Sequence, residues 1–442
     1  MTTALTTRPN LRRPALLLDE HGREIPTARR IVADRSARGM ETYNTHPAFE
    51  LTLENLLSYY RMAERGQPLR QFDCFHDVIE MDPDLRSKVN GRIESVAGCD
   101  WVVMPGRSDK PSELAAGALN ERLQNQIEFR AFLTHQLTCV HYGMAMTNFV
   151  WDFEEGVIVP IDFVNPASRR FAAPTAERAN EIWLVDGATG GSTLIELVPG
   201  LWGTSIYRNI LSRNPYAGGL MRSCSVWSMF KRWSVRDWQV FAAMFGIPMA
   251  IGYYEEGAGP KSKEALEDAV RAIGQDGWAV LSSLTELVVK ETSRGGDSST
   301  VFPQMIKLCE DQIAKLLTGG TLNSDVADVG SYNAASVHES RGYQMLCFDA
   351  QCVQEMFVRD IGRTFVAWNG YDRAAPPRLK IKIKRDALQW AQTLEILGQA
   401  IELDSDQIYE DFSLRVPMPG KGVKFLPTPP PDPGHAREDK KK

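Results

Sequence analysis

Hydrophobic positions in the first half of the chain recur at helical spacing in some stretches and form short apolar or alternating runs in others. Helical spacing predicts amphipathic helices, and the shorter runs predict strands. The predicted helices cover 47–65, 76–98 and two stretches within 111–148, and the predicted strands cover 101–105, 157–163 and 182–185. Asp82-Pro83 favours a helix N-terminus, and the glycine-rich segment 187–191 predicts the turn of a hairpin.

The second half of the chain is predicted to begin with a long, unusually aromatic helix over 218–245. Its aromatic side chains recur at helical spacing, which favours a core or a seam between helices over base stacking. A strand–helix–strand unit follows, with strands over 249–254 and 278–281 around a charged helix over 262–273. The later predicted elements are a strand at 287–290, helices at 302–317 and 334–367, a strand at 378–384, and helices at 387–400 and 404–412.

Three polar segments interrupt or flank these elements. Residues 1–45 are polar and Arg-rich, which indicates an arm that is ordered only by contact with something else. A Gly/Ser/Asn/Asp stretch at 319–331 breaks the helical pattern, and the Pro-rich, Lys-ended segment 427–442 predicts a disordered tail. Helices and strands mixed in this order predict an α+β fold class.

Composition and charge place the chain among folded proteins without a strongly basic surface. Its 442 residues are 43% hydrophobic and 24% charged, and the formal net charge is −6. This length predicts about two to four domain-sized units. Because binding dominated by phosphate contacts needs clustered Lys and Arg, any contact with DNA is expected to be local or weak.

The cysteines and the N-terminus indicate a reducing compartment. Seven scattered cysteines, most of them among apolar residues, predict free buried thiols rather than a disulfide framework. Residues 1–10 have no apolar core segment, so no signal peptide is expected, and no apolar run is long enough for a membrane span. The chain is therefore expected to be made in a cytoplasm.

No motif for catalysis, metal binding or cofactor binding is complete in the sequence. The segment 257–262 has the wrong glycine spacing for a phosphate loop, and Pro260 removes a backbone donor. His135, Cys139 and His141 lack further ligands nearby, and His338 has no nucleophile elbow with it. The chain is therefore expected to be no enzyme, with no catalytic residue, no metal and no cofactor.

Six blocks in order along nearly the whole chain resemble the Mu-type bacteriophage portal proteins. They read LLLDEHGREIP (16–26), MDPDLRSKVNGRIESVAGCDWVVMP (81–105), WSVRDWQVFAAMFGIPMAIGYYEEGA (233–258), AIGQDGWAVL (272–281), KLCEDQIAKLLTGGTLNSDVADVGSYNAASVHESRG (307–342) and RDIGRTFVAWNG (359–370). The resemblance implies a portal fold with a wing, two stem helices, an α/β clip insertion, a tunnel loop and a small crown.

The resemblance also implies a division of the chain into these parts. They are an N-terminal arm (1–45), the first part of the wing (46–216), stem helix 1 (217–245), the clip (246–291), stem helix 2 (300–318), the tunnel loop (319–333), wing completion and a small crown (334–426), and a disordered tail (427–442). The C-terminal part is short for a large crown.

The function implied by the resemblance is that of a ring-forming subunit, with 12 as the expected number of subunits, at the capsid vertex of a tailed phage or prophage. Such a ring is the channel for DNA packaging and ejection, and double-stranded DNA passes through it non-specifically. The implied protein partners are the terminase large subunit, the major capsid or scaffold proteins, and the head-completion and tail connector proteins. The implied location is the virion, after assembly in the host cytoplasm.

Three groups of residues are expected to carry this function. Polar, uncharged side chains of the tunnel loop are expected to contact DNA: Thr321, Asn323, Ser324, Ser331, Tyr332 and Asn333. Charged side chains of the clip helix are expected to bind partners: Lys261, Lys263, Glu264, Glu267 and Arg271. Aromatic side chains are expected to pack the stem: Trp227, Phe230, Trp238, Phe241 and Phe245.

Two other functions remain open from the residues alone. One is another structural head component, such as a minor capsid or connector protein. The other is a DNA-processing enzyme such as a nuclease, which would require clustered Asp, Glu or His metal ligands.

Overall fold

The computed structural model describes most of the chain between residues 46 and 383. The described residues are 46–154, 156–186, 193–207, 214–245, 250–255, 257, 259–273, 278–282, 298–320 and 332–383. The chain divides into two compact units, Met1–Ile383 and Lys384–Lys442, and every described residue belongs to the first. The expected arm and tail, the strand at 287–290 and the helices at 387–400 and 404–412 therefore lie outside the described residues.

The first three helices are α1 (Leu53–Glu64), α2 (Leu69–Met81) and α3 (Pro83–Ala97). The prediction of one helix over 76–98 is therefore wrong, because the chain breaks at Asp82. Asp82 is extended, with φ −112° and ψ 100°, as expected for a residue before proline. Its carboxylate accepts a hydrogen bond from the Leu85 amide at 3.2 Å and so caps α3.

A three-stranded antiparallel sheet lies next along the chain, in the order β3-β2-β7. After α4 (Lys110–Gln124), α5 (Glu128–Leu137) and α6 (Cys139–Tyr142) come β2 (Met144–Glu154), β3 (Val157–Val164) and, later, β7 (Trp202–Ile206). The helical prediction that ran to residue 148 is wrong over its last five positions. Gly143 ends α6 in the left-handed region, with φ 96°, so the chain turns there into β2.

Two further sheets are small; one joins segments that are far apart in the sequence, and the other joins three consecutive strands. β1 (Trp101–Met104) pairs antiparallel with β10 (Arg378–Ile381), which joins the end of the described chain to the segment that follows α3. β4 (Phe171–Ala172), β5 (Trp183–Val185) and β6 (Leu194–Glu196) form the other sheet in chain order. The antiparallel pairing of β5 with β6 confirms the predicted hairpin, although its turn at 187–191 is outside the described residues.

The long helix predicted over 334–367 is observed as three consecutive helical pieces. α10 (Tyr332–Met356) continues into a π-helical turn (Phe357–Gly362) and then α11 (Arg363–Asn369). The Asp360 carboxylate in the π-helical turn accepts a hydrogen bond from the Thr204 amide at 2.9 Å, which fixes β7 to this helix. A change of helical pitch of this kind turns side chains relative to the preceding helix.

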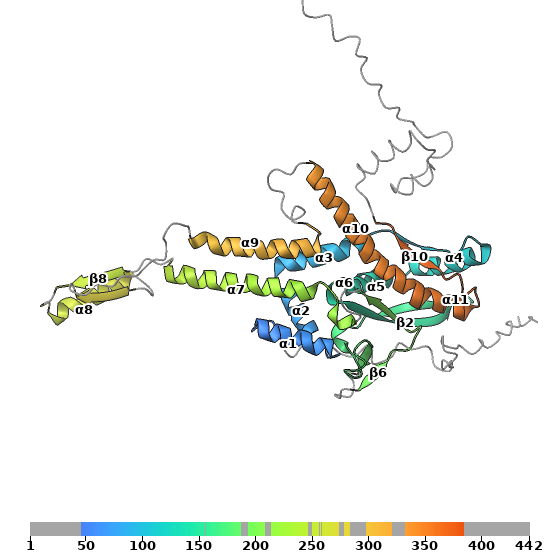
Figure 1. The fold of residues 1–442 in the computed structure, drawn as a ribbon, viewed down its shortest axis with the longest axis horizontal. Helices are drawn as coiled ribbons and strands as arrows, with labels where there is room; N and C mark the ends of the chain where they lie inside the picture. The colour runs from blue at the N-terminus through green and yellow to red at the C-terminus, as the bar shows by residue number, and fades with distance from the viewer. Residues whose placement is uncertain are drawn as a thin grey trace, which may run out of the picture. The chain divides into compact units, whose positions relative to one another are not determined.

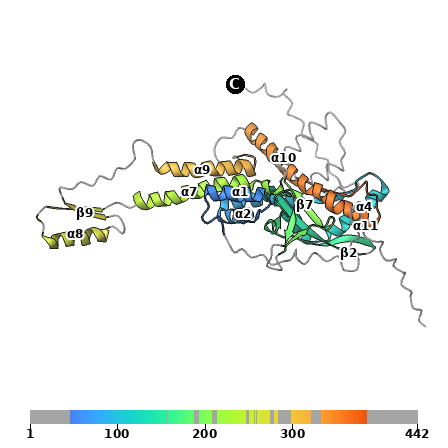
Figure 2. The same ribbon diagram turned by 60° about the horizontal axis from the view of Figure 1, so that its bottom comes forward.

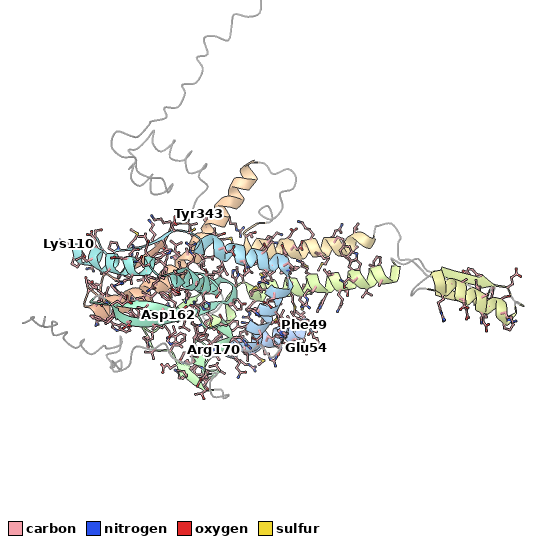
Figure 3. All side chains as sticks on the ribbon, turned by 180° about the vertical axis from the view of Figure 1, so that it is seen from behind. Phe49, Glu54, Lys110, Asp162, Arg170 and Tyr343 are labelled. Carbon is pink, nitrogen blue, oxygen red and sulfur yellow. The ribbon has the colours of Figure 1, made fainter. Side chains whose placement is uncertain are left out.

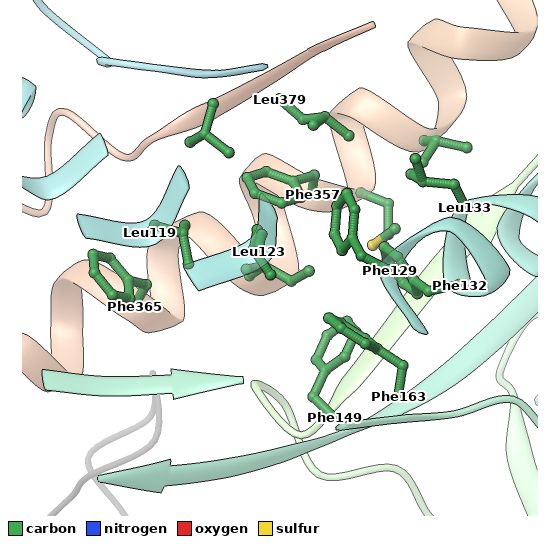
Figure 4. Packing of buried hydrophobic residues seen from close by; sticks show 14 of the residues in the cluster. Leu119, Leu123, Phe129, Phe132, Leu133, Phe149, Phe163, Phe357, Phe365 and Leu379 are labelled. Atoms are coloured by element: carbon green, nitrogen blue, oxygen red, sulfur yellow. The ribbon is translucent and has the colours of Figure 1, made fainter. Parts of the chain in front are cut away.

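Aromatic rings form the centre of the core between β2, β3, α5 and the π-helical turn (Figure 4). Phe132 and Phe163 stack with centroids 4.6 Å apart, and Phe129 lies 5.7 Å from Phe163. Phe357 meets Phe129 edge to face at 6.5 Å. Each ring buried in this way stabilises the fold by about 2–3 kcal/mol through removal of apolar surface from water.

Candidate functional site

Two long helices, α7 (Met221–Phe245) and α9 (Ser298–Leu317), lie side by side along much of their length (Figures 1 and 2). The 25 residues of α7 span about 37 Å at the usual rise per residue. The N-terminal half of α7 is fixed in the core, where Met221, Cys224 and Met229 are buried. The helix predicted over 302–317 begins earlier, at Ser298, and includes Pro303 near its N-terminus.

The aromatic residues of α7 are divided between the core and the surface. Trp227, Phe230 and Trp233 form a series of edge-to-face contacts with centroids 6.1 and 5.8 Å apart. Phe241 contacts Phe302 of α9 at 5.6 Å. Trp238, however, remains 40% exposed, and the side chain of Phe245 is outside the described residues.

Exposed apolar side chains continue along both helices, whose side chains are drawn in Figure 3. On α7 they are Val235, Trp238 and Val240, and on α9 they are Val301 and Leu308. Residues three or seven apart in a helix lie on the same side of it, so Val301 and Leu308 share one side of α9. Val235 and Trp238, three residues apart, likewise share one side of α7, and exposed apolar side chains of this kind are typical of surfaces that a protein partner covers.

A buried charge cluster fixes α7 against α3 and α9. The Lys231 ammonium lies 3.0 Å from the Asp82 carboxylate and 2.9 Å from that of Glu310. Burial disfavours the charged lysine, but its hydrogen bond to Glu310 and the charge of Asp82 outweigh burial and raise the pKa of Lys231. The Ser228 hydroxyl also donates to Asp82, at 3.1 Å.

A second buried ion pair lies at the C-terminus of α9. The Nε and Nη2 groups of Arg92 donate hydrogen bonds to the two carboxylate oxygens of Asp349 on α10, at 2.7 and 2.9 Å. Its remaining nitrogen donates to the Leu316 and Leu317 carbonyls, at 3.2 and 3.0 Å. Burial opposes the charge of Arg92, but the hydrogen bonds that Arg92 donates to Asp349 outweigh burial and raise the pKa of Arg92.

Most of the expected DNA-contacting residues are not among the described residues. Thr321, Asn323, Ser324 and Ser331 lie outside the described part of the chain. Tyr332 and Asn333, expected in the loop, form the first turn of α10 instead. Neither residue is a Gly or Pro, so the helix that was predicted from Ala334 can begin at Tyr332.

The predicted strand–helix–strand unit is present as β8 (Ala250–Tyr254), α8 (Pro260–Ile273) and β9 (Trp278–Ser282), with β8 and β9 parallel. Pro260 starts α8, where a missing amide hydrogen has no cost. The five expected partner-binding residues all lie on α8. Lys261, Lys263, Glu264 and Arg271 are exposed and Glu267 is partly buried, and the Lys263 ammonium lies over the Tyr254 ring at 5.3 Å.

The candidate metal ligands are core residues in the described part of the chain. His135 and Cys139 belong to different helices, and the Nε2–H group of His135 donates to the Met146 carbonyl at 2.9 Å. Burial lowers the pKa of His135 to about 4 and that of His141 to about 3. The described residues contain no group of three His, Cys, Asp or Glu side chains placed for a metal ion.

Two further predictions concern disulfide bonds and membrane-spanning helices. All seven cysteines are free, and five of them are buried, which confirms the predicted free thiols. Among the described residues, no helix combines the length and the apolar character that crossing a bilayer would require.

Comparison with known proteins identifies relatives over most of the chain. The family model of the portal protein of Mu bacteriophage matches residues 72–414. The Mu-like prophage FluMu protein gp29 of Haemophilus influenzae is 28% identical over 366 residues, which cover 80% of this chain and 68% of the relative. The portal protein of Escherichia phage Mu is 28% identical over 341 residues, which cover 76% of this chain and 65% of the relative.

Among solved structures, a chain of the virion of a native gene transfer agent particle aligns with a TM-score of 0.49 and 14% identity, covering 87% of this chain and 98% of that chain. The family model spans well over half of the sequence, and the fold combines helices and sheets as expected. That family is a structural phage family, so the chain is a structural phage protein rather than an enzyme. The chain belongs to the portal proteins of the Mu bacteriophage type.

Proposed function

We propose that the chain is the ring-forming subunit of a phage or prophage portal, located at the capsid vertex of the virion. The observation that carries this proposal is the match of the Mu portal family model over residues 72–414. In this role the ring is the conduit through which double-stranded DNA is packaged and ejected.

The ring is proposed to contain identical subunits, with 12 as the expected number, joined by head-to-tail interfaces that close by rotation. The exposed apolar side chains of α7 and α9 support this arrangement, because a neighbouring copy would remove them from water. Val240 and Val301 are 53% and 60% exposed in the single subunit. Packing between neighbours would use Trp238, whereas Phe241 and Phe302 pack α7 against α9 within each subunit.

The segment 319–333 is proposed to contact DNA within the channel. Its polar residues carry no positive charge, and Asp325 and Asp328 would repel phosphate. The net charge of −6 supports a channel through which DNA slides, because a uniformly basic bore would retain phosphates through counterion release. With Tyr332 and Asn333 in α10, the proposed contact surface includes the first turn of that helix.

The segment 246–291 is proposed to be the clip, which binds the terminase large subunit during packaging and head-completion or tail connector proteins afterwards. Its helix α8 supports this role, because Lys261, Glu264 and Arg271 offer charges of both signs to a partner. The rest of the proposed division follows the same order: the first part of the wing over 46–216, stem helices over 217–245 and 300–318, and wing completion with a small crown over 334–426.

Electron microscopy of the purified protein tests the portal function. We expect a closed ring with a central channel wide enough for a DNA duplex. A protein that forms no channel would instead be another structural head component, such as a minor capsid protein. Metal-dependent cleavage of plasmid DNA by the purified protein would contradict the proposal outright.

A further inference from the structure

The buried side chain of Arg92 joins the two helices that border residues 318–331. The geometry points to Arg92 as a positioning residue that holds the end of α9 and the middle of α10 at a fixed separation. This inference rests on the proposed role of 319–333 as the DNA-contacting segment of the channel, because it concerns how that segment is anchored.

The contacts of Arg92 divide between two consecutive helices, α9 and α10, that are both far from Arg92 in the sequence. Its Nε and Nη2 groups donate to the Asp349 carboxylate of α10, and its Nη1 group donates to the Leu316 and Leu317 carbonyls of α9. The Arg92 and Asp349 side chains are 5% and 1% exposed. A planar guanidinium can satisfy both sets of acceptors at once, whereas the ammonium of a lysine is a single point of charge.

The electrostatics of both partners favour a cation at this position. The last carbonyls of a helix lack partners within the helix and carry the negative end of its dipole. The Asp349 carboxylate adds a full negative charge from the other side. A single arginine therefore satisfies the C-terminus of α9 and neutralises a buried carboxylate of α10.

The helix that carries Arg92 is itself firmly held. Leu85, Val89 and Val96 of α3 are buried in the core, and Asp82 at its N-terminus binds Lys231 of α7. A displacement of the α9 end or of α10 is thus opposed by α3 through Arg92. Because the chain between these two helices contains 318–331, Arg92 is one of the contacts that connect the borders of that segment to the core.

A glycine adds a close contact at the same place. Gly319 has φ 80°, a conformation that L side chains rarely adopt. A Cβ atom there would lie 2.7 Å from the Met345 sulfur of α10. The chain therefore leaves α9 directly against α10, within one turn of the residues that Arg92 binds, with no room there for a larger side chain between the two helices.

The test uses hydrogen–deuterium exchange of the full-length protein, with peptides covering 310–320, 341–350 and, as a distant control, 144–154. The variant Arg92→Met/Asp349→Leu replaces the ion pair by apolar groups of similar volume, a change that folded proteins often tolerate. We expect exchange at least tenfold faster in both 310–320 and 341–350, with no change in 144–154. Unchanged exchange in both peptides would overturn the inference.

A second variant distinguishes positioning from general stability. Arg92→Lys retains a cation for Asp349 but cannot also reach both α9 carbonyls. We expect faster exchange in 310–320 alone, with 341–350 within twofold of the parent protein. If both peptides exchange faster to the same extent, Arg92 stabilises the fold without linking the two helices separately, and the inference fails.

DNA retention in packaged particles, measured on the same variants, separates this inference from the proposed function. Faster exchange with impaired retention supports both. Faster exchange with normal retention leaves Arg92 as the link between the helices but removes the channel role of 319–333.

Discussion

Truncation of Trp238 on α7 is expected to weaken the ring more than the subunit. Trp238 is 40% exposed in the single chain, beside the exposed Val235. In a ring, this surface would be covered by a neighbouring copy. The substitution Trp238→Ala therefore removes apolar surface that only assembly buries.

The expected magnitude follows from the exposed area. A tryptophan side chain presents up to about 250 Å², so the exposed part is roughly 100 Å². At about 25 cal/mol per Å², covering it contributes at most about 2.5 kcal/mol for each interface. Since part of this gain is offset on association, we expect each interface to weaken by about 1–2.5 kcal/mol, which is roughly fivefold to seventyfold in affinity.

Sedimentation velocity over a range of protein concentrations measures the distribution between subunits and rings, and thermal melting at low concentration measures the subunit. Phe153→Ala is the matched control, because Phe153 is an aromatic residue on β2 with 53% exposure. We expect rings of Trp238→Ala to dissociate at a higher concentration than rings of Phe153→Ala. If the two variants assemble like the parent protein, the interface assignment of α7 is wrong.

Three further predictions concern stability. Phe132→Ala removes a fully buried ring stacked on Phe163 and should lower the free energy of unfolding by about 3–5 kcal/mol in a urea titration; a loss below about 1 kcal/mol would contradict the core assignment. His141 is buried, and burial lowers its pKa to about 3. In the unfolded protein His141 takes up a proton near pH 6.5, so the unfolded state is favoured and stability is lost as pH falls below about 6.5. Between pH 7 and pH 5 this loss is about 2 kcal/mol, and urea titrations of His141→Leu should lack it; an identical pH dependence in both proteins would refute the assignment. Lys231→Met leaves the Asp82 carboxylate, which is 3% exposed, without its cation and should cost about 3–5 kcal/mol, whereas Lys231→Arg should recover part of this loss; equal melting temperatures for all three proteins would contradict it.

The parts of the fold that were predictable are those with a strong local signal. The helix around Trp227 and the strand–helix–strand unit around α8 have the periods that the sequence indicates. The errors arose where one residue outweighed the apolar pattern on either side of it. Pro83 divides an apolar pattern that reads as one continuous helix, and Gly143 turns the chain into β2 although the residues after it suit either structure.

The candidate site was less predictable than the fold. The spacing of the aromatic residues of α7 predicted that they pack, and Trp227 and Phe230 do contact each other. The 40% exposure of Trp238 depends on which elements lie near it in the fold, which the spacing does not show. The Arg92–Asp349 pair joins residues 257 positions apart, and no local pattern connects them. A single sequence carries no signal for such a contact, because both residues also fit an exposed helix surface.

Cryo-electron microscopy of the purified, assembled protein tests the central claim most directly. The account predicts a closed ring of identical subunits, with α7 and α9 of each subunit against its neighbour and with residues 319–333 facing a channel wide enough for duplex DNA. A protein that remains a monomer, or a ring in which 319–333 face away from the channel, would contradict it.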